Sequence, residues 1–369
     1  MTAYLVILAV AAVATYALTF VVRGLAGRLG AVVPPDERRV HTKTTPTAGG
    51  AAMFLAFLLA MGAATRIPQF RPMFDGTTPL GVVLGGAVVF AVGLVDDLRE
   101  MSAPAKLAGQ VLAGSVLSLL GVVMVFFRVP FLDLIGVSSD LAPLATVLWV
   151  VAMTNAVNLI DGLDGLAAGV VAIAAGAFFL YSFHLQSADV GLLALNNPAP
   201  LLAVIACGMC LGFLPHNFHP ARIFMGDAGA MLLGLLMAAA TLLVGGGTDT
   251  EFSGQTFFFY APIFIPFFIL GVPILDTILA IVRRAARRSG VAIADRDHLH
   301  YRLERMGHGH RRAVLILWAW TAILSGFVLY PAFTARGNHV VVFGVAALGA
   351  GLYTLFHPGV RVRQQSTEV

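Results

Sequence analysis

Charged side chains are scarce in this sequence. Asp, Glu, Lys and Arg together make up 11% of its 369 residues, whereas they supply about a quarter of an average soluble domain. Apolar residues account for 59% of the chain, and the mean hydropathy is +0.88. This composition excludes an ordinary soluble domain and predicts an integral membrane protein, for which no nucleic-acid partner is expected.

Cysteine is also scarce. The chain has two, Cys207 and Cys210, three residues apart within one apolar run. A metal or redox site would need a second pair or polar neighbours, so we expect buried thiols and no disulfide. Ser-rich or Pro-rich linkers and low-complexity tracts are absent too, which predicts a single transmembrane domain over residues 1–369.

Long apolar segments are what the chain has in quantity. A helix crosses a bilayer with about 20 apolar residues, because its backbone polar groups must be paired internally. Eleven segments meet this requirement: 3–22, 50–65, 79–95, 105–126, 141–158, 165–185, 199–214, 228–245, 256–281, 313–331 and 339–356. The sequence therefore predicts an all-α polytopic membrane protein with about eleven transmembrane helices.

Basic residues predict the orientation. Lys and Arg are retained on the cytoplasmic side of a membrane, and 19 of the 23 in this chain follow odd-numbered segments or lie in the C-terminal tail. The N-terminus is therefore expected outside and the C-terminus in the cytoplasm. The cytoplasmic loops, about 23–49, 96–105, 158–165, 215–228 and 282–312, hold most of the acids and histidines.

Two adjacent acids, Asp96 and Asp97, follow the third segment. The carbonyl end of a helix is electrostatically unfavourable for anions, and ionisable groups at a membrane edge indicate a functional site. A solvated helix end is the alternative. On the same side, Lys106 opens the fourth segment and Lys43 lies in the first cytoplasmic loop, each either a topological anchor or a ligand.

Amide and acid side chains recur at steps of three in Asn155, Asn158, Asp161 and Asp164. Such steps keep the first three near one helix face, while the flanking glycines permit a break that redirects Asp164. Their oxygens suit Mg²⁺, which prefers hard ligands and substrate phosphates. A simple turn between two helices is the alternative.

The loop before the eighth segment contributes Arg222 and Asp227. Arg222 could meet a phosphate through two parallel hydrogen bonds. Asp227 could cap the following helix, or it could complete a metal site with the two clusters above.

Two histidines and an intramembrane acid are the remaining candidate site residues. His298 and His300 lie near Arg302 in the long loop before the tenth segment. They would suit hydrogen bonds to a sugar or phosphate, although the loop's arginines alone could serve anionic lipid headgroups. Zinc-site spacing is lacking. Asp276, inside the ninth segment, needs a partner or a water-filled cavity.

Together these motifs resemble the polyprenyl-phosphate N-acetylhexosamine-1-phosphate transferase family over about residues 35–312. The likeness is greatest to the branch that loads N-acetylglucosamine-1-phosphate onto undecaprenyl or decaprenyl phosphate. Pro273, Asp276 and Thr277 favour this branch over the phospho-N-acetylmuramoyl-pentapeptide translocases. One departure is Tyr301, where many relatives carry a second adjacent histidine, and this leaves the role of that position open.

The resemblance implies a role for each matched residue. Asp96, Asp97 and Asp227 match catalytic positions; Asn158 and Asp227 match magnesium and pyrophosphate positions; Asp161 and Asp164 match the nucleotide pocket; and the segment from Asp295 to Arg302, with His298 and His300, matches the sugar-recognition loop. Lys43, Lys106, Asn155, Arg222 and Asp276 join the expected substrate-binding set.

The implied reaction joins two anionic substrates at the inner face of the cytoplasmic membrane. A polyprenyl phosphate attacks a UDP-N-acetylhexosamine and releases UMP, with Mg²⁺ as cofactor, Mn²⁺ as a substitute and a homodimer as the expected assembly. Because a phosphate monoester is largely dianionic at pH 7, we expect direct attack, but a covalent phospho-aspartate stays open. An ion-coupled transporter is the competing class, although its site would lie near the midplane, often between repeats.

Overall fold

The computed structural model describes residues 1–29, 32–33, 45–124, 126–128, 134–187, 190–245, 303, 306–334 and 339–356. Five predicted site residues lie outside these ranges: Lys43, Asp276, His298, His300 and Arg302. The expected span 256–281 and position Tyr301 lie outside them as well.

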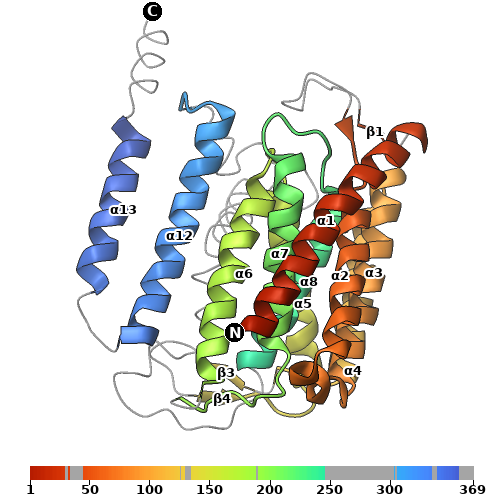
Figure 1. Ribbon diagram of the computed structural model, residues 1–369, viewed down its shortest axis with the longest axis vertical. Coiled ribbons are helices and arrows are strands. Elements are labelled where there is room, and N and C mark those ends of the chain that lie inside the picture. Colours follow the sequence, from red (N-terminus) through yellow and green to blue (C-terminus); the bar gives the residue numbers. More distant parts are fainter. Residues whose placement is uncertain are drawn as a thin grey trace, which may run out of the picture.

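The described chain is a bundle of α-helices (Figure 1). The helices are α1 (Thr2–Leu29), α2 (Gly49–Arg66), α3 (Thr78–Leu98), α4 (Ala103–Leu119), α5 (Ala142–Ile160), α6 (Leu166–Leu185), α7 (Ala199–Asn217), α8 (Gly226–Gly245), α12 (His310–Thr334) and α13 (His339–Phe356). A 3₁₀ helix, η1, spans Pro68–Phe74. Two short antiparallel pairs, β1 (Val32–Val33) with β2 (Thr45–Pro46) and β3 (Phe126–Arg128) with β4 (Leu134–Gly136), lie in the loops.

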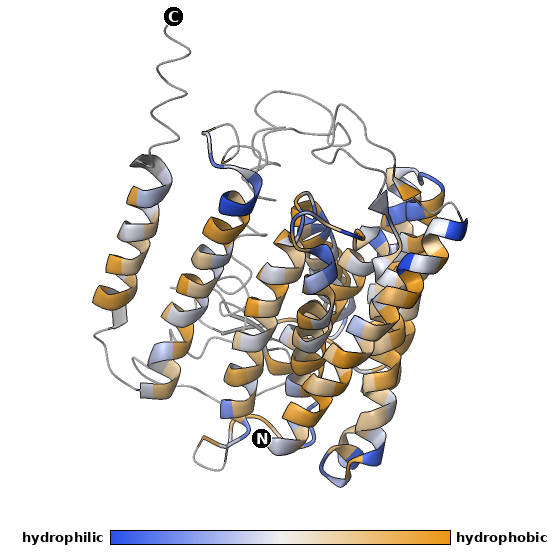
Figure 2. Cartoon of the chain, turned by 45° about the horizontal axis from the view of Figure 1, so that its top comes forward, coloured by the Kyte–Doolittle hydropathy of each residue, from blue (hydrophilic) through white to orange (hydrophobic). Residues whose placement is uncertain are grey.

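Eight of the described helices are long and apolar enough to cross a membrane: α1, α2, α3, α5, α6, α7, α8 and α12. The chain is therefore an all-α multi-pass membrane protein, as predicted. Figure 2 shows apolar residues along the helix shafts and hydrophilic residues mainly at the helix ends and in the loops. The helix in the expected span 105–126 is shorter than predicted. It ends at Leu119, and Gly121 then adopts a left-handed φ of 95°.

The core lies around α6, α7 and α8. These helices are buried over most of their surface, and each is apolar on all sides, as expected for a central helix. In contrast, α1 and α13 expose large apolar side chains such as Val13 and Val341, which suits contact with lipid. Cys207 and Cys210 are buried and free in α7, as predicted.

Helix α8 packs against α2, α3, α5 and α7. The approach to α3 is closest at Gly93, where an added Cβ would overlap the backbone of Ala228. Because only glycine permits this approach, the carboxyl end of α3 lies directly against the amino end of α8. The acids predicted at these two ends are therefore neighbours in space.

Candidate active site

The predicted polar clusters meet at one end of the bundle. Helices α3, α5 and α7 end there, and α4, α8 and α12 begin there. Chain direction alternates between successive helices, so clusters that are far apart in sequence share this end.

A lysine is at the centre of the first cluster. The Nζ of Lys106 lies 2.9 Å from Oδ2 of Asp96 and also donates to Oδ2 of Asp227. All three side chains are partly buried, with 19% of Lys106, 17% of Asp96 and 28% of Asp227 exposed. The other oxygen of Asp96 accepts the backbone N–H of Met101 at 2.7 Å, so this carboxylate spans the turn between α3 and α4.

The amide of Asn158 completes this cluster. In the orientation that its neighbours favour, Nδ2 donates to Oδ1 of Asp227 at 3.1 Å and Oδ1 accepts from Nζ of Lys106 at 3.2 Å. Each polar atom of Asn158 therefore has a partner, and α4, α5 and α8 are joined through three side chains. We call Asp96, Lys106, Asn158 and Asp227 the lysine cluster.

Asp97 faces a different partner from Asp96. Its Oδ1 accepts the backbone N–H of Asp227 at 2.8 Å, and its Oδ2 accepts that of Ala228 at 3.2 Å. These are two of the free N–H groups in the first turn of α8, which carry the positive end of the helix dipole. Gly226 has a φ of 71°, and a Cβ there would collide with the Asp97 carboxylate, so glycine is required at the start of α8.

Asn155 pairs with a residue on α4. Its Nδ2 donates to Oε1 of Gln110 at 2.6 Å and to the carbonyl of Val151 at 2.8 Å, and Gln110 donates back from Nε2 at 3.4 Å. Gln110 is buried, so this amide pair fixes α4 against α5 one helical turn from Lys106.

Asp161 is half-buried directly after α5. Burial raises the pKa of its carboxyl to about 7, and repulsion from Asp97 and then Asp164 adds to the rise. This arrangement holds several carboxylates close enough to affect one another, which favours a site that binds cations.

Asp164 is held by two histidines from distant parts of the chain. Its Oδ2 accepts from Nδ1 of His219 at 2.7 Å and from the backbone N–H of Ala221 at 3.0 Å. Its own backbone N–H donates to Nε2 of His310 at 3.0 Å. The two imidazole rings stack, with centroids 4.3 Å apart.

The ligand atoms of Asp164, His219 and His310 lie within 4.8 Å of one another, a spacing that could hold a metal ion. However, Oδ2 of Asp164 and Nε2 of His310 already accept backbone hydrogen bonds, and Nδ1 of His219 donates to the carboxylate. We therefore interpret the group as a hydrogen-bonded clamp on the turn between α5 and α6.

Two further contacts fix the loops around the clamp. The buried Asn217 accepts from the N–H of Gly165 at 3.0 Å and donates to the carbonyl of Ile223 at 3.0 Å. The backbone N–H of Phe224 donates to the carbonyl of Pro46 at 2.9 Å, which brings the segment before α2 beside the start of α8. Arg222 is exposed in the loop between α7 and α8.

Sequence reasoning gave no individual role to Gln110, His219 or His310. Gln110 lies four residues after Lys106, on the same face of α4, and this spacing was a usable signal. The joint contact of His219 and His310 with Asp164 depends on how α7 and α12 are placed, which no local pattern specifies.

The lysine cluster has the chemistry of a metal site. Asn158 and Asp227 offer the hard oxygen ligands that Mg²⁺ prefers, and the ammonium of Lys106 lies between oxygens of both. A cation is therefore already stabilised at this position, and the donor set fits the expected ion.

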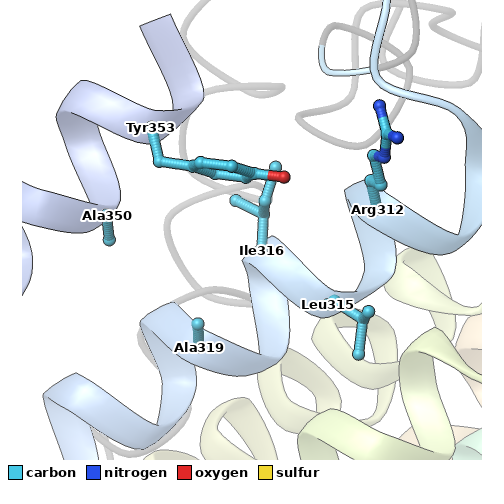
Figure 3. Close-up of a pocket in the computed structure, with 6 residues that line it drawn as sticks. All are labelled: Arg312, Leu315, Ile316, Ala319, Ala350 and Tyr353. Carbon is cyan, nitrogen blue, oxygen red and sulfur yellow. The ribbon is translucent and has the colours of Figure 1, made fainter. Parts of the chain in front are cut away.

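A groove of about 210 Å³ lies between α12 and α13 (Figure 3). Leu315, Ile316, Ala319 and Ala350 make most of its wall apolar, the ring of Tyr353 extends across it from α13, and Arg312 lies at one end. No predicted site residue lines this groove.

Residues 79–245 match the sequence model of glycosyl transferase family 4. The polar clusters described above lie within this range, apart from His310, which belongs to α12. The matched region therefore includes most of the helix ends at which the acids and amides meet.

Over longer stretches the chain is similar to bacterial transferases. It is 41% identical to the decaprenyl-phosphate N-acetylglucosaminephosphotransferase of Mycobacterium tuberculosis (strain CDC 1551 / Oshkosh), over 94% of this chain and 86% of that protein. It is 38% identical to a probable undecaprenyl-phosphate N-acetylglucosaminyl 1-phosphate transferase of Bacillus subtilis (strain 168), over 84% and 78%. Similarity to a phospho-N-acetylmuramoyl-pentapeptide-transferase of Desulforudis audaxviator (strain MP104C) is 33% identity, over 81% and 88%.

Proposed function

The chain belongs to glycosyl transferase family 4, and we propose that it transfers N-acetylglucosamine-1-phosphate from UDP-N-acetylglucosamine to a polyprenyl phosphate. The relatives named for N-acetylglucosamine transfer share more identity with it than the pentapeptide transferase does. Undecaprenyl and decaprenyl phosphate are both candidate acceptors. The product would be the first lipid-linked sugar of a cell-envelope glycan.

The observation that carries this proposal is the lysine cluster at the membrane edge. Two carboxylates, an amide and an ammonium come from α3, α4, α5 and α8 within a few ångströms of one another. Such a site suits a reaction between two phosphates, one on a soluble nucleotide and one on a lipid headgroup that reaches the same depth.

The reaction is a substitution at the β-phosphorus of the nucleotide sugar. An oxygen of the lipid phosphate forms a bond to this phosphorus while the bond to the UMP oxygen breaks. The lipid phosphate is largely dianionic at pH 7, so the proposal needs no covalent aspartyl intermediate. Asp96 and Asp97 then orient groups rather than attack: Asp96 holds Lys106, and Asp97 holds the start of α8.

Asn158 and Asp227 are the proposed holders of Mg²⁺, with Mn²⁺ as a substitute. When bound, the ion would neutralise the pyrophosphate and the charge that develops on the leaving UMP. Lys106 supplies a further positive charge to the approaching phosphates, and Asp227 keeps its position because Asp97 fixes its backbone.

The remaining predicted residues are proposed to bind substrate. Asp161 and Asp164 would face the nucleotide, with Asn155 supporting them through its pairing with Gln110. Arg222, Lys43, Asp276, His298, His300 and Arg302 would contact phosphates or the sugar. We further propose that this end of the bundle faces the cytoplasm and that the N-terminus lies outside.

The competing function is an ion-coupled transporter. Its substrate site would lie near the bilayer midplane, whereas the lysine cluster joins helix ends. This placement favours an enzyme that works at the membrane surface.

The test is transfer of sugar label from UDP-N-acetylglucosamine to undecaprenyl phosphate by the purified protein, with and without Mg²⁺. We expect lipid-soluble label that depends on Mg²⁺. Transfer only from another UDP-N-acetylhexosamine would correct the sugar, and absence of transfer from every donor by folded protein would overturn the proposal.

A further inference from the structure

We propose that the ammonium of Lys106 is a resident cation that competes with the metal for Asn158 and Asp227, and that substrate phosphate draws it away. This inference rests on the proposed function and concerns how the same site is loaded. It assigns Lys106 a second role, as the residue that makes metal binding depend on substrate.

The first support is that both oxygens of Asp227 already accept hydrogen bonds from the lysine cluster. Its Oδ2 accepts from Lys106 and its Oδ1 from Asn158. The oxygen of Asn158 also accepts from Lys106, at 3.2 Å. The ammonium therefore occupies the place between Oδ2 of Asp227 and Oδ1 of Asn158, and a metal ion that binds between these two oxygens would have to displace it.

The second support is charge. The two carboxylates of Asp96 and Asp227 face one ammonium, and Asn158 is neutral. A divalent ion placed beside Lys106 would meet a like charge at short range in a partly buried site, where water screens less than in bulk. Metal binding and the present position of Lys106 therefore oppose each other.

The third support is that Lys106 can leave Asp227 and still keep a charged partner, Asp96. Lys106 lies in the first turn of α4 on a flexible four-carbon stem, and its contact with Asp96 at 2.9 Å does not involve the proposed metal ligands. Asp96 is itself fixed by the N–H of Met101. The ammonium can thus leave Asp227, stay near Asp96 and pair with a substrate phosphate.

Thermodynamic linkage gives the consequence. If phosphate binds the ammonium that otherwise blocks the metal ligands, phosphate and metal must each raise the affinity of the other. The substrate-free enzyme would then bind metal weakly and take it up together with its anionic substrate. Loss of Lys106 should tighten metal binding by substrate-free protein while turnover falls.

The experiment measures Mn²⁺ binding to detergent-purified, substrate-free full-length protein from the electron paramagnetic resonance signal of free Mn²⁺. Lys106→Met removes the charge and leaves no polar head, whereas Lys106→Gln removes the charge and keeps a polar head. Lys106→Arg keeps it. Arg99→Met is the matched control, because Arg99 is an exposed cation at the end of α3 outside the lysine cluster.

We expect Lys106→Met and Lys106→Gln to lower the Mn²⁺ dissociation constant about tenfold or more, which corresponds to about 1.4 kcal/mol. Lys106→Arg and Arg99→Met should stay near wild type. Unchanged or weaker binding in both neutral variants, with folding verified by thermal unfolding, would overturn the proposal. If one neutral variant fails to fold, the other decides.

Asp227→Asn separates this inference from the proposed metal site. If Asp227→Asn abolishes Mn²⁺ binding but the neutral Lys106 variants do not tighten it, the site stands and the competition is wrong. If Asp227→Asn leaves binding intact, the metal assignment itself is wrong.

Discussion

The carboxylate of Asp97 accepts the backbone N–H of Asp227 at 2.8 Å. One predicted catalytic acid therefore holds the other in place, from a different helix and 130 residues away. The adjacent acid, Asp96, turns instead to Lys106. Two neighbouring aspartates thus hold the two partners of one ion pair, Lys106 and Asp227.

Replacing Gly226 by alanine should displace the Asp97 carboxylate. The new Cβ would collide with it, and a φ of 71° is strained for alanine. We expect a lower unfolding temperature, since loss of a helix cap costs about 1 kcal/mol, together with strongly reduced transfer. Gly62→Ala on α2, where a Cβ meets nothing within 4 Å, is the control. Wild-type activity in Gly226→Ala would show that this contact is dispensable.

Asp227→Asn should abolish turnover without unfolding the protein. The amide keeps the shape of the carboxylate, but the charge that binds Lys106 and the proposed metal is lost. We expect a loss of at least about 100-fold in transfer, in line with removal of a major electrostatic group. Size-exclusion chromatography in detergent checks folding, and substantial remaining turnover would contradict the assignment.

Asp161 should make stability depend on pH. Its pKa is about 7 in the folded protein against an ordinary value of 3.8, so the folded state holds a proton that the unfolded chain releases. Stability is greatest below about pH 4 and falls as pH rises to about 7. Asp161→Asn removes this pH-dependent contribution to the stability of the fold.

The unfolding temperature of Asp161→Asn relative to wild type is therefore expected to rise between pH 5 and pH 8. Thermal unfolding in detergent at several pH values measures this difference. A difference that does not change with pH would mean that the carboxyl titrates normally.

His219→Ala should weaken nucleotide binding through Asp164. His219 donates to the carboxylate at 2.7 Å, and loss of a hydrogen bond to a charged group costs about 1.5–3 kcal/mol. We expect the KM for the UDP-sugar to rise about tenfold or more with a smaller change in kcat. His219→Asn, which can place an N–H near the Nδ1 position, should restore much of the KM. Equal effects of both substitutions would argue against this positioning role.

Much of the fold follows from composition. Each expected span within the described residues coincides with a helix, because long apolar runs in a bilayer leave the backbone few alternatives. The predicted end of the fourth span is wrong, because the apolar run continues beyond Gly121, whereas the left-handed φ of Gly121 ends α4 at Leu119. Hydropathy does not record such backbone breaks.

The sequence predicts which residues form the site more completely than it predicts the contacts between them. The sequence predicts Asn155 among the substrate ligands, but it does not predict that Asn155 pairs with Gln110. It also treated Asp96 and Asp97 as one pair, although their carboxylates have separate partners. Which way a side chain turns at a helix end depends on the neighbouring helix, and local spacing carries no information about that neighbour.

The most direct test of the account follows the two phosphorus atoms of UDP-N-acetylglucosamine. The donor is labelled with ³²P at either the α- or the β-phosphate and incubated with undecaprenyl phosphate, Mg²⁺ and purified protein, with Asp227→Asn as the inactive control. We expect β-label in the lipid product and α-label in UMP. Label from the β-phosphate that stays in water-soluble products, or α-label in the lipid, would contradict transfer of the sugar phosphate.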